Sequence, residues 1–259
     1  MNGTDVAVNV LGRPSTANPV TMSATRPLIS IIDIDPELSA GLDEDSLALA
    51  RRHLAAAPMT LPSGVLDTSS PNGDHPAPAL GLYLVDGLVA RDVELAGRST
   101  TELLGAGDVI RPWDDRFELE SLPGSITWWV VEPARAILLD RRFAAVAGRW
   151  PQMLDTIVQR TMRRSRSLAV QRAIAQVPRV DARVMVLMWM LADRWGKVSP
   201  DGVRLPLALT HDTIAKLVGA RRPSVTTALG SLSRKGLIQR TSDGWLLHGD
   251  SADAWQQLG

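Results

Sequence analysis

The sequence predicts an α+β protein in which a β-rich N-terminal half, a long helix and a C-terminal winged helix-turn-helix follow one another. Three observations lead to this fold class. Short apolar segments separated by Gly or Pro fill residues 28–140, apolar residues recur at helical spacing across residues 141–177, and a helix-turn-helix pattern flanked by short strands occupies residues 178–250. Residues 1–27 offer no periodic apolar face, so we expect a disordered tail there.

Composition narrows the possible functions. The chain has 259 residues, enough for two compact domains with separate cores. It has no cysteine, which excludes disulfides, thiolate metal sites and cysteine nucleophiles. No apolar run reaches the roughly 18 residues of a membrane span. The N-terminus also lacks the apolar block of a secretory signal, so we expect a cytoplasmic protein without membrane contact.

The net charge of zero hides a division along the chain. Residues 1–140 carry 9 Lys or Arg and 20 Asp or Glu, whereas residues 141–259 carry 19 and 8. A strongly basic half indicates a nucleic-acid partner. Charges that merely solvate a surface would give the same composition. The position of the basic residues must therefore decide between a nucleic-acid partner and a solvated surface.

The N-terminal half has the pattern of a β-sandwich or barrel. Residues 81–85 and 88–94 predict two strands around a tight turn at Asp86-Gly87. Further short apolar pieces follow at residues 103–104, 109–110, 126–131 and 136–139. Residues 68–78 contain three Pro, two Ser, one Asn and one Gly and predict a loop.

The long helix predicted over residues 141–177 carries only a thin apolar seam. The seam consists of Leu154, Ile157, Val158, Thr161, Leu168 and Ala175. Because a helix with such a narrow face depends on packing for its stability, a second subunit is the natural partner. We therefore expect a homodimer, the alternative being a helix that lies on its own domain.

The segment from Thr210 to Gly236 carries the functional pattern. A helix capped by Asp181 precedes it. Thr210 is a good N-cap for a short helix, and Gly219 permits the left-handed residue of a tight inter-helix turn. Pro223 then suits the first turn of a second helix. Residues 237–240 and 245–248, around Ser242-Asp243-Gly244, predict a β-hairpin wing.

The second helix has an apolar inner face and an outer face of Arg, Thr and small residues, which fits a DNA major groove. We expect base or phosphate contacts from Thr210, His211, Lys216, Arg221, Arg222, Pro223, Ser224, Thr226, Thr227 and Arg240. An ordinary helical hairpin inside a core would leave this polar face and the basic half unexplained.

Thr210 to Arg240 resembles the C-terminal winged helix of the cyclic-AMP receptor protein family, the Crp/Fnr regulators. More weakly, the resemblance covers residues 58–248. It implies a β-roll sensor of jelly-roll or cupin-like fold, a dimerisation helix and a winged helix. The implied partners are double-stranded DNA, RNA polymerase and a small-molecule effector of unknown identity. The family's base-reading positions fall on Arg222, Pro223 and Thr227, and only Arg222 keeps the residue type of the cyclic-AMP receptor protein.

The family's cyclic-nucleotide pocket is not preserved. Gly107-Asp108 resembles the turn before the phosphate-binding cassette, and residues 134–140 resemble the last strand of the roll. The cassette's ribose-binding Gly-Glu then falls on Arg111-Pro112, and its phosphate-binding Arg falls on Leu122. The polar pair that meets adenine falls on Leu168-Ala169. Leu cannot pair with a phosphate and Pro has no carboxylate, so standard cyclic-AMP binding is not expected.

Other chemistry has little support in the sequence. Arg116, Arg135 or the arginines of the long helix could hold an anionic effector, and Trp113, Trp128 and Trp129 could line an apolar pocket. His53 and His75 do not form a clustered metal site, and no enzyme motif is present. We expect no enzyme activity and no cofactor. The alternative to a DNA-binding regulator is a ligand-binding signalling module whose winged helix contacts protein.

Overall fold

The computed structural model describes residues 28–66, 80–114 and 123–252. The predictions for the tail at residues 1–27 and the loop at 68–78 lie outside this part of the chain, as do Arg116, Leu122 and His75. Among the described residues no helix has the length and apolar character needed to cross a membrane.

Residues 28–56 form mainly small helices, with two short paired strands, where the sequence predicted β structure throughout. The elements are β1 (Ile29–Ser30), α1 (Ile31–Ile34), the 3-10 helix η1 (Pro36–Ser39), α2 (Glu44–His53) and β2 (Ala55–Ala56). The Asp43 side chain accepts a hydrogen bond from the Ser46 backbone N–H at 2.7 Å and so caps α2. Acidic residues in the first turn of α2 and basic residues in the last suit the helix dipole, so this signal was present in the sequence.

The β-roll contains six antiparallel strands. These are β3 (Met59–Leu61), β4 (Gly64–Val65), β5 (Gly81–Leu95), β6 (Arg98–Gly105), β7 (Val109–Ile110) and β8 (Gly124–Leu139). The central order is β3-β8-β5-β6, with β4 paired to β8 and β7 paired to β5. An apolar cluster that includes Trp113 and Trp128 packs on one face of the roll sheet.

The hairpin predicted at Asp86-Gly87 is wrong, because β5 continues through these residues. Strand β8 pairs with β5 from Gly81 to Leu95, and the register shifts around residues 84–89. Gly87 has φ +82°, and a Cβ there would lie 2.4 Å from the Ala134 Cα. An Asp-Gly pair therefore marks a bulge with close backbone approach here, instead of a chain reversal.

The long helix predicted over residues 141–177 is divided into two helices. Helix α3 (Arg141–Ala147) begins at Asp140, whose side chain accepts from the Phe143 N–H at 2.8 Å. Helix α4 (Pro151–Ile174) is the long one. Because Pro151 has no N–H to continue the α3 hydrogen bonds, it starts a new helix after the turn at residues 148–150.

The apolar seam predicted on the long helix points in two directions. Leu154 and Ile157 pack against the protein's own N-terminal core. Val158 and Met162 are 53% and 56% exposed, and Ser165 and Ala169 continue the same face at heptad-like spacing. The unpartnered face of α4 thus lies opposite the face that covers the roll.

The C-terminal part is a winged helix-turn-helix, as the sequence predicted. It contains α5 (Val180–Trp195), β9 (Lys197–Ser199), β10 (Gly202–Leu205), α6 (His211–Val218), α7 (Arg222–Arg234), β11 (Ile238–Arg240) and β12 (Trp245–Leu247). The four strands follow the order β11-β12-β10-β9. Asp181 does not occupy the N-cap of α5; that position belongs to Arg179, and Asp181 lies in the first turn.

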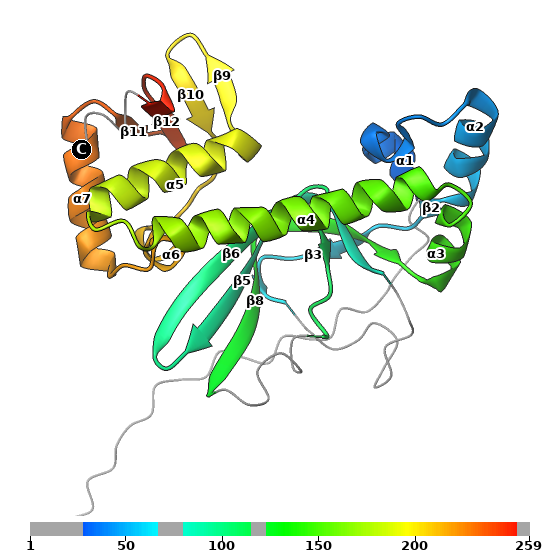
Figure 1. The fold of residues 1–259 in the computed structure, drawn as a ribbon, viewed down its shortest axis with the longest axis horizontal. Coiled ribbons are helices and arrows are strands. Elements are labelled where there is room, and N and C mark those ends of the chain that lie inside the picture. Colours follow the sequence, from blue (N-terminus) through cyan, green and yellow to red (C-terminus); the bar gives the residue numbers. More distant parts are fainter. Residues whose placement is uncertain (1–27, 67–79, 115–122, 253–259) are drawn as a thin grey trace, which may run out of the picture.

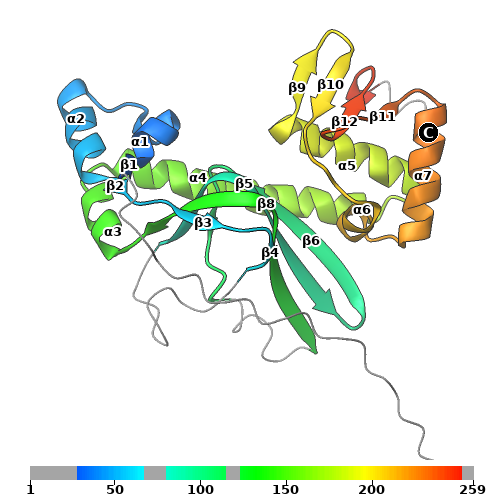
Figure 2. The same cartoon turned by 180° about the vertical axis from the view of Figure 1, so that it is seen from behind.

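Helix α4 forms the long axis of the molecule (Figure 1). The small N-terminal helices and α3 lie at one end, the winged helix lies at the other, and the roll runs beneath α4 (Figures 1 and 2). The roll and the winged helix share one core, because Leu88, Ala90 and Leu103 of the roll pack among residues of α5, α6 and α7.

Candidate nucleic-acid interface

The turn between α6 and α7 is set by a cap and a glycine. The Thr210 hydroxyl accepts from the Thr213 N–H at 3.0 Å and thereby fixes the start of α6. Gly219 ends α6 in a left-handed conformation, φ 63° and ψ 38°. That conformation reverses the chain direction within a few residues, so α7 can begin at Arg222.

One side of each helix is buried and holds the pair together. Ile214 and Val218 on α6 and Val225 and Leu232 on α7 are each 0% exposed. The opposite side of α7 is open, since Arg222, Pro223, Thr226, Thr227 and Gly230 are all exposed. The predicted reading face is therefore the solvent face of α7.

The two threonines of this face use their hydroxyl protons within the helix. Thr226 donates to the Arg222 carbonyl oxygen at 3.1 Å and Thr227 to the Pro223 carbonyl oxygen at 3.2 Å. What they present outward is a methyl group and oxygen lone pairs. Arg222 is thus the side chain of this group with free donors for a base edge, and Arg221 and Ser224 are exposed beside it.

Two further predicted residues lie at the side of α7. The His211 Nδ1 is 2.9 Å from the Thr226 Oγ1, which ties the start of α6 to the reading helix. An Arg240 Nη donates to the Leu209 carbonyl oxygen at 3.0 Å, and its guanidinium lies 4.6 Å from the Trp245 ring centroid. The structure therefore brings the wing to the start of α6.

Lys216 has a different environment from the other nine residues for which we expect DNA contacts. Its ammonium lies 2.8 Å from the Asp92 carboxylate on β5 of the roll and 3.7 Å from Asp212. The hydrogen bond to Asp92 raises the pKa of Lys216 despite partial burial. Lys216 thus joins α6 to the roll in this structure, a contact that sequence spacing gave no means of predicting.

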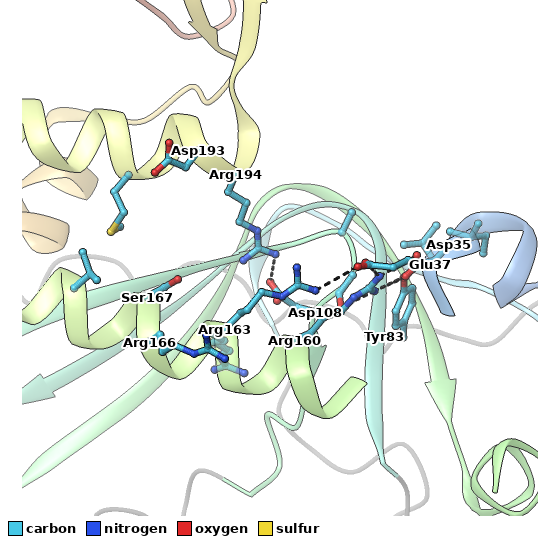
Figure 3. Close-up of a pocket in the computed structure, with 17 residues that line it drawn as sticks. Asp35, Glu37, Tyr83, Asp108, Arg160, Arg163, Arg166, Ser167, Asp193 and Arg194 are labelled. Atoms are coloured by element: carbon cyan, nitrogen blue, oxygen red, sulfur yellow. Dashed lines mark hydrogen bonds and ion pairs between the residues drawn. The ribbon is translucent and has the colours of Figure 1, made fainter. Parts of the chain in front are cut away.

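A pocket of about 670 Å³ lies between α4, α5, the roll and η1. Its polar lining is shown in Figure 3, with Arg163, Arg166 and Ser167 along α4 and Asp193 and Arg194 on α5. Arg194 reaches the Asp108 carboxylate at 2.6 Å. The pocket lies on the face of β5 that carries Tyr83 and Val85, away from the apolar cluster that contains Leu82 and Leu84.

Arg160 forms the other end of this pocket (Figure 3). It pairs with Asp35 and, at 2.5 Å, with Glu37, and the Tyr83 hydroxyl donates to Asp35 at 2.5 Å. Burial acts to raise the pKa of Asp35, but the hydrogen bonds from Arg160 and Tyr83 outweigh it and hold that pKa below its usual value. Burial, followed by the hydrogen bond to Asp35, raises the pKa of Tyr83.

The described residues contain no group of three or more His, Asp or Glu placed to hold a metal ion. Two further arginines also pair with carboxylates of the protein. Arg164 forms a two-pronged pair with Glu102 of β6, with nitrogen–oxygen distances of 2.5 and 2.7 Å. Arg135, considered above for an anion, pairs with Asp86 at 2.6 Å.

The comparisons with known proteins agree with this geometry. Residues 182–248 match the model of the Crp-like helix-turn-helix domain family. This segment is a Crp-like helix-turn-helix domain. It coincides with α5 to β12, so the domain contains the solvent face of α7.

Two cyanobacterial proteins are similar over the same part of the chain. A global nitrogen regulator of Synechocystis is 33% identical over 67 residues, 26% of this chain and 30% of that protein. A global nitrogen regulator of Synechococcus elongatus is 37% identical over 57 residues, 22% of this chain and 26% of that protein. The similarity thus spans less than a third of these curated relatives.

Solved structures extend the likeness to 78% of this chain. A CooA mutant from Carboxydothermus hydrogenoformans superposes with a TM-score of 0.59 at 18% identity, covering 78% of this chain and 87% of that one. A CRP/FNR family transcriptional regulator from Thermus thermophilus gives 0.53 at 18% identity, covering 78% and 100%. The chain therefore has the fold of the CRP/FNR regulators.

Proposed function

We propose that the protein is a transcription regulator of the Crp/Fnr type that binds a specific double-stranded DNA sequence as a homodimer. The observation that carries the proposal is the solvent face of α7, where Arg222 stands exposed at the start of a helix held by a Crp-like domain. A helix of this kind fits the major groove with its N-terminal residues nearest the bases.

The remaining exposed residues of the interface support a division of roles. Arg222, Pro223 and Thr227 occupy the reading positions. Arg221, Ser224 and Thr210 are exposed beside them and His211 is partly exposed, and we assign these four to the DNA backbone. RNA polymerase is the partner through which such a regulator acts on transcription. Winged-helix binding to a protein, the other hypothesis, has no observation in its favour here.

The homodimer is proposed to form along α4, through the exposed face that carries Val158, Met162, Ser165 and Ala169. This face is a better candidate than the seam predicted from sequence, since Leu154 and Ile157 already have partners in their own chain.

Two recognition helices related by a two-fold axis meet the same face of the duplex about 34–36 Å apart, so the operator should be an inverted repeat.

Cyclic AMP is not proposed as the effector. The roll contains an apolar cluster with Trp128 only 2% exposed and Trp113 only 4% exposed. Arg111, at the position of the family's ribose-binding glycine, instead forms an ion pair with Asp114. These side chains fill the face of the roll that carries Leu82 and Leu84, and the departures from the family cassette support the same proposal.

The test of this proposal is selection of an operator from genomic fragments, followed by footprinting and competition with single-base variants. Arg222→Ala should cost about 1–3 kcal/mol per half-site and relax the preference at one base pair. Arg234→Ala is the matched control, because Arg234 is an exposed arginine at the other end of α7. An unchanged ranking of operator variants by Arg222→Ala would show that Arg222 contacts only the backbone.

A further inference from the structure

The pocket between α4, α5, the roll and η1 has the size of a small-molecule site. Its volume is about 670 Å³, and small-molecule sites in proteins commonly enclose about 300–1,000 Å³. It is not the cyclic-nucleotide pocket of the family, because Arg111, Pro112, Leu168 and Ala169, which stand at the family's nucleotide-binding positions, do not line it. The chemistry of its ligand must therefore be inferred from its own lining.

Three of the five arginines among the described lining residues are already used within the chain. Arg160, Arg164 and Arg194 each hold a carboxylate, at nitrogen–oxygen distances of 2.9, 2.5 and 2.6 Å. The carboxylates paired with Arg160 and Arg194 belong to side chains that are only 13% and 8% exposed. These arginines cannot turn to a ligand without leaving a buried carboxylate unpaired.

The other two arginines keep donors available. Arg163 lies 3.6 Å from Glu37, which already accepts a hydrogen bond from Arg160 at 2.5 Å. Within the described parts of the chain, the side chains of Arg166 and Ser167 have no ion pair or hydrogen bond. Arg166 and Ser167 follow Arg163 by three and four residues, so all three lie on one side of α4 (Figure 3). Two positive charges and a hydroxyl therefore meet there without a close counter-charge of their own.

The opposite wall of the pocket belongs to α5 (Figure 3). It contributes Asp193 and Met190, and Val170 and Val85 add apolar surface from α4 and β5. Asp193 has no ion pair in the described parts of the chain, and its carboxylate can accept a hydrogen bond from a hydroxyl or ammonium group. A negative wall disfavours a polyanion that fills the whole space. The lining thus suits a small organic molecule with its anionic group toward α4.

We infer that this pocket binds a small organic anion, whose carboxylate or phosphate group is held by Arg163, Arg166 and Ser167. Guanidinium groups bind both kinds of anion through paired N–H donors. The inference rests on the proposed function and deepens it by naming the site and the chemical class of an effector. Because α4 packs on the roll and α5 belongs to the winged helix, a ligand that contacts both walls stabilises one arrangement of the two parts and changes the affinity for the operator.

The first experiment measures anion binding to the full chain by calorimetry, in the absence of DNA. Inorganic phosphate and succinate are the two probes, and chloride keeps the ionic strength constant. At least one of them should bind saturably at one site per subunit, with a dissociation constant of about 1 mM or lower, the strength of two hydrogen bonds between charged groups. The tighter probe distinguishes a phosphate ligand from a carboxylate ligand.

Matched substitutions separate the pocket from the general charge of α4. Arg166→Gln should weaken anion binding about ten-fold or more, and Ser167→Ala should weaken it less. Arg172→Gln is the control, since Arg172 is an exposed arginine in the last turn of the same helix and does not line the pocket. Absence of saturable binding with both probes overturns the inference, as does an Arg172→Gln protein weakened as much as Arg166→Gln.

The second experiment measures operator affinity of the full chain with and without the tighter probe at one ionic strength. The affinity should change about five-fold or more. Arg172→Gln should keep this response and Arg166→Gln should lose it, which separates it from the general effect of salt on DNA binding. A bound anion that leaves operator affinity unchanged overturns its role as an effector. Failure to select any operator would instead overturn the proposed function, whereas the calorimetry needs no DNA.

Discussion

Arg160 shows how a single side chain can join distant parts of the chain. Its side chain is 14% exposed and that of its partner Asp35 is 13% exposed. Arg160→Met leaves the Asp35 carboxylate buried without its main partner, which should lower the free energy of unfolding by about 3–5 kcal/mol. Arg135→Met removes a pair whose side chains are 53% and 45% exposed, so the loss of stability should be far smaller than that of Arg160→Met. Urea denaturation measures both, and equal losses would show that the Arg160 pair is no more buried in solution than a surface pair.

At the scale of single residues, the sequence predicted those whose role depends on a few neighbouring positions. Thr210 as a cap, Gly219 as a left-handed turn residue and the exposure of Arg222 all follow from a few neighbouring positions. Arg160 was not singled out, because Asp35 is 125 residues away in sequence. Gln171 was missed for the same reason: its buried amide donates to the carbonyl oxygens of Thr101 and Leu217, on two other elements. The spacing of residues along one segment does not indicate a hydrogen-bond partner that lies far away in the sequence.

Among the elements, α4 gives the clearest test of assembly. Val158→Asp with Met162→Asp places two carboxylates on the exposed apolar face, where a partner helix would have to bury them. We expect monomers in sedimentation and weak binding to the inverted repeat. Val198→Asp is the matched control, because Val198 is 90% exposed on β9, away from α4. A double variant that remains dimeric would place the interface elsewhere.

Helices α5 and α7 were predicted better than the strands of the roll, for a physical reason. The 3.6-residue period of α4, α5 and α7 is visible in a single segment, whereas the length of a strand depends on its partner. Strand β5 continues past Asp86-Gly87 only because β8 pairs along both halves of it. The division of the long helix, in contrast, has a local signal in the sequence, because Pro151 has no N–H with which to continue α3.

At the scale of the whole molecule, the roll and the winged helix are connected through three polar contacts and a shared core. Lys216 meets Asp92, Arg194 meets Asp108, and Gln171 of α4 bonds both β6 and α6. The sequence predicted the domains and their order but had no means of predicting this contact, because it depends on how finished domains pack. The winged helix is therefore held in a defined position relative to the roll.

Lys216 contacts the roll in this structure, whereas the sequence predicted that it contacts DNA. Its ammonium is already paired with Asp92, and its side chain is only 32% exposed. Lys216→Met should therefore increase hydrogen exchange in α6 and along β5 and β6, while the salt dependence of operator binding stays unchanged. Asp86→Asn, at a carboxylate of β5 that pairs within the roll, should leave exchange in α6 as in the wild type. If Lys216→Met instead flattens the salt slope by about 0.9 per subunit, Lys216 leaves Asp92 on binding and contacts a phosphate. The two readouts assign Lys216 either to the contact between domains or to the DNA backbone, because counterion release reports only charges that reach the duplex.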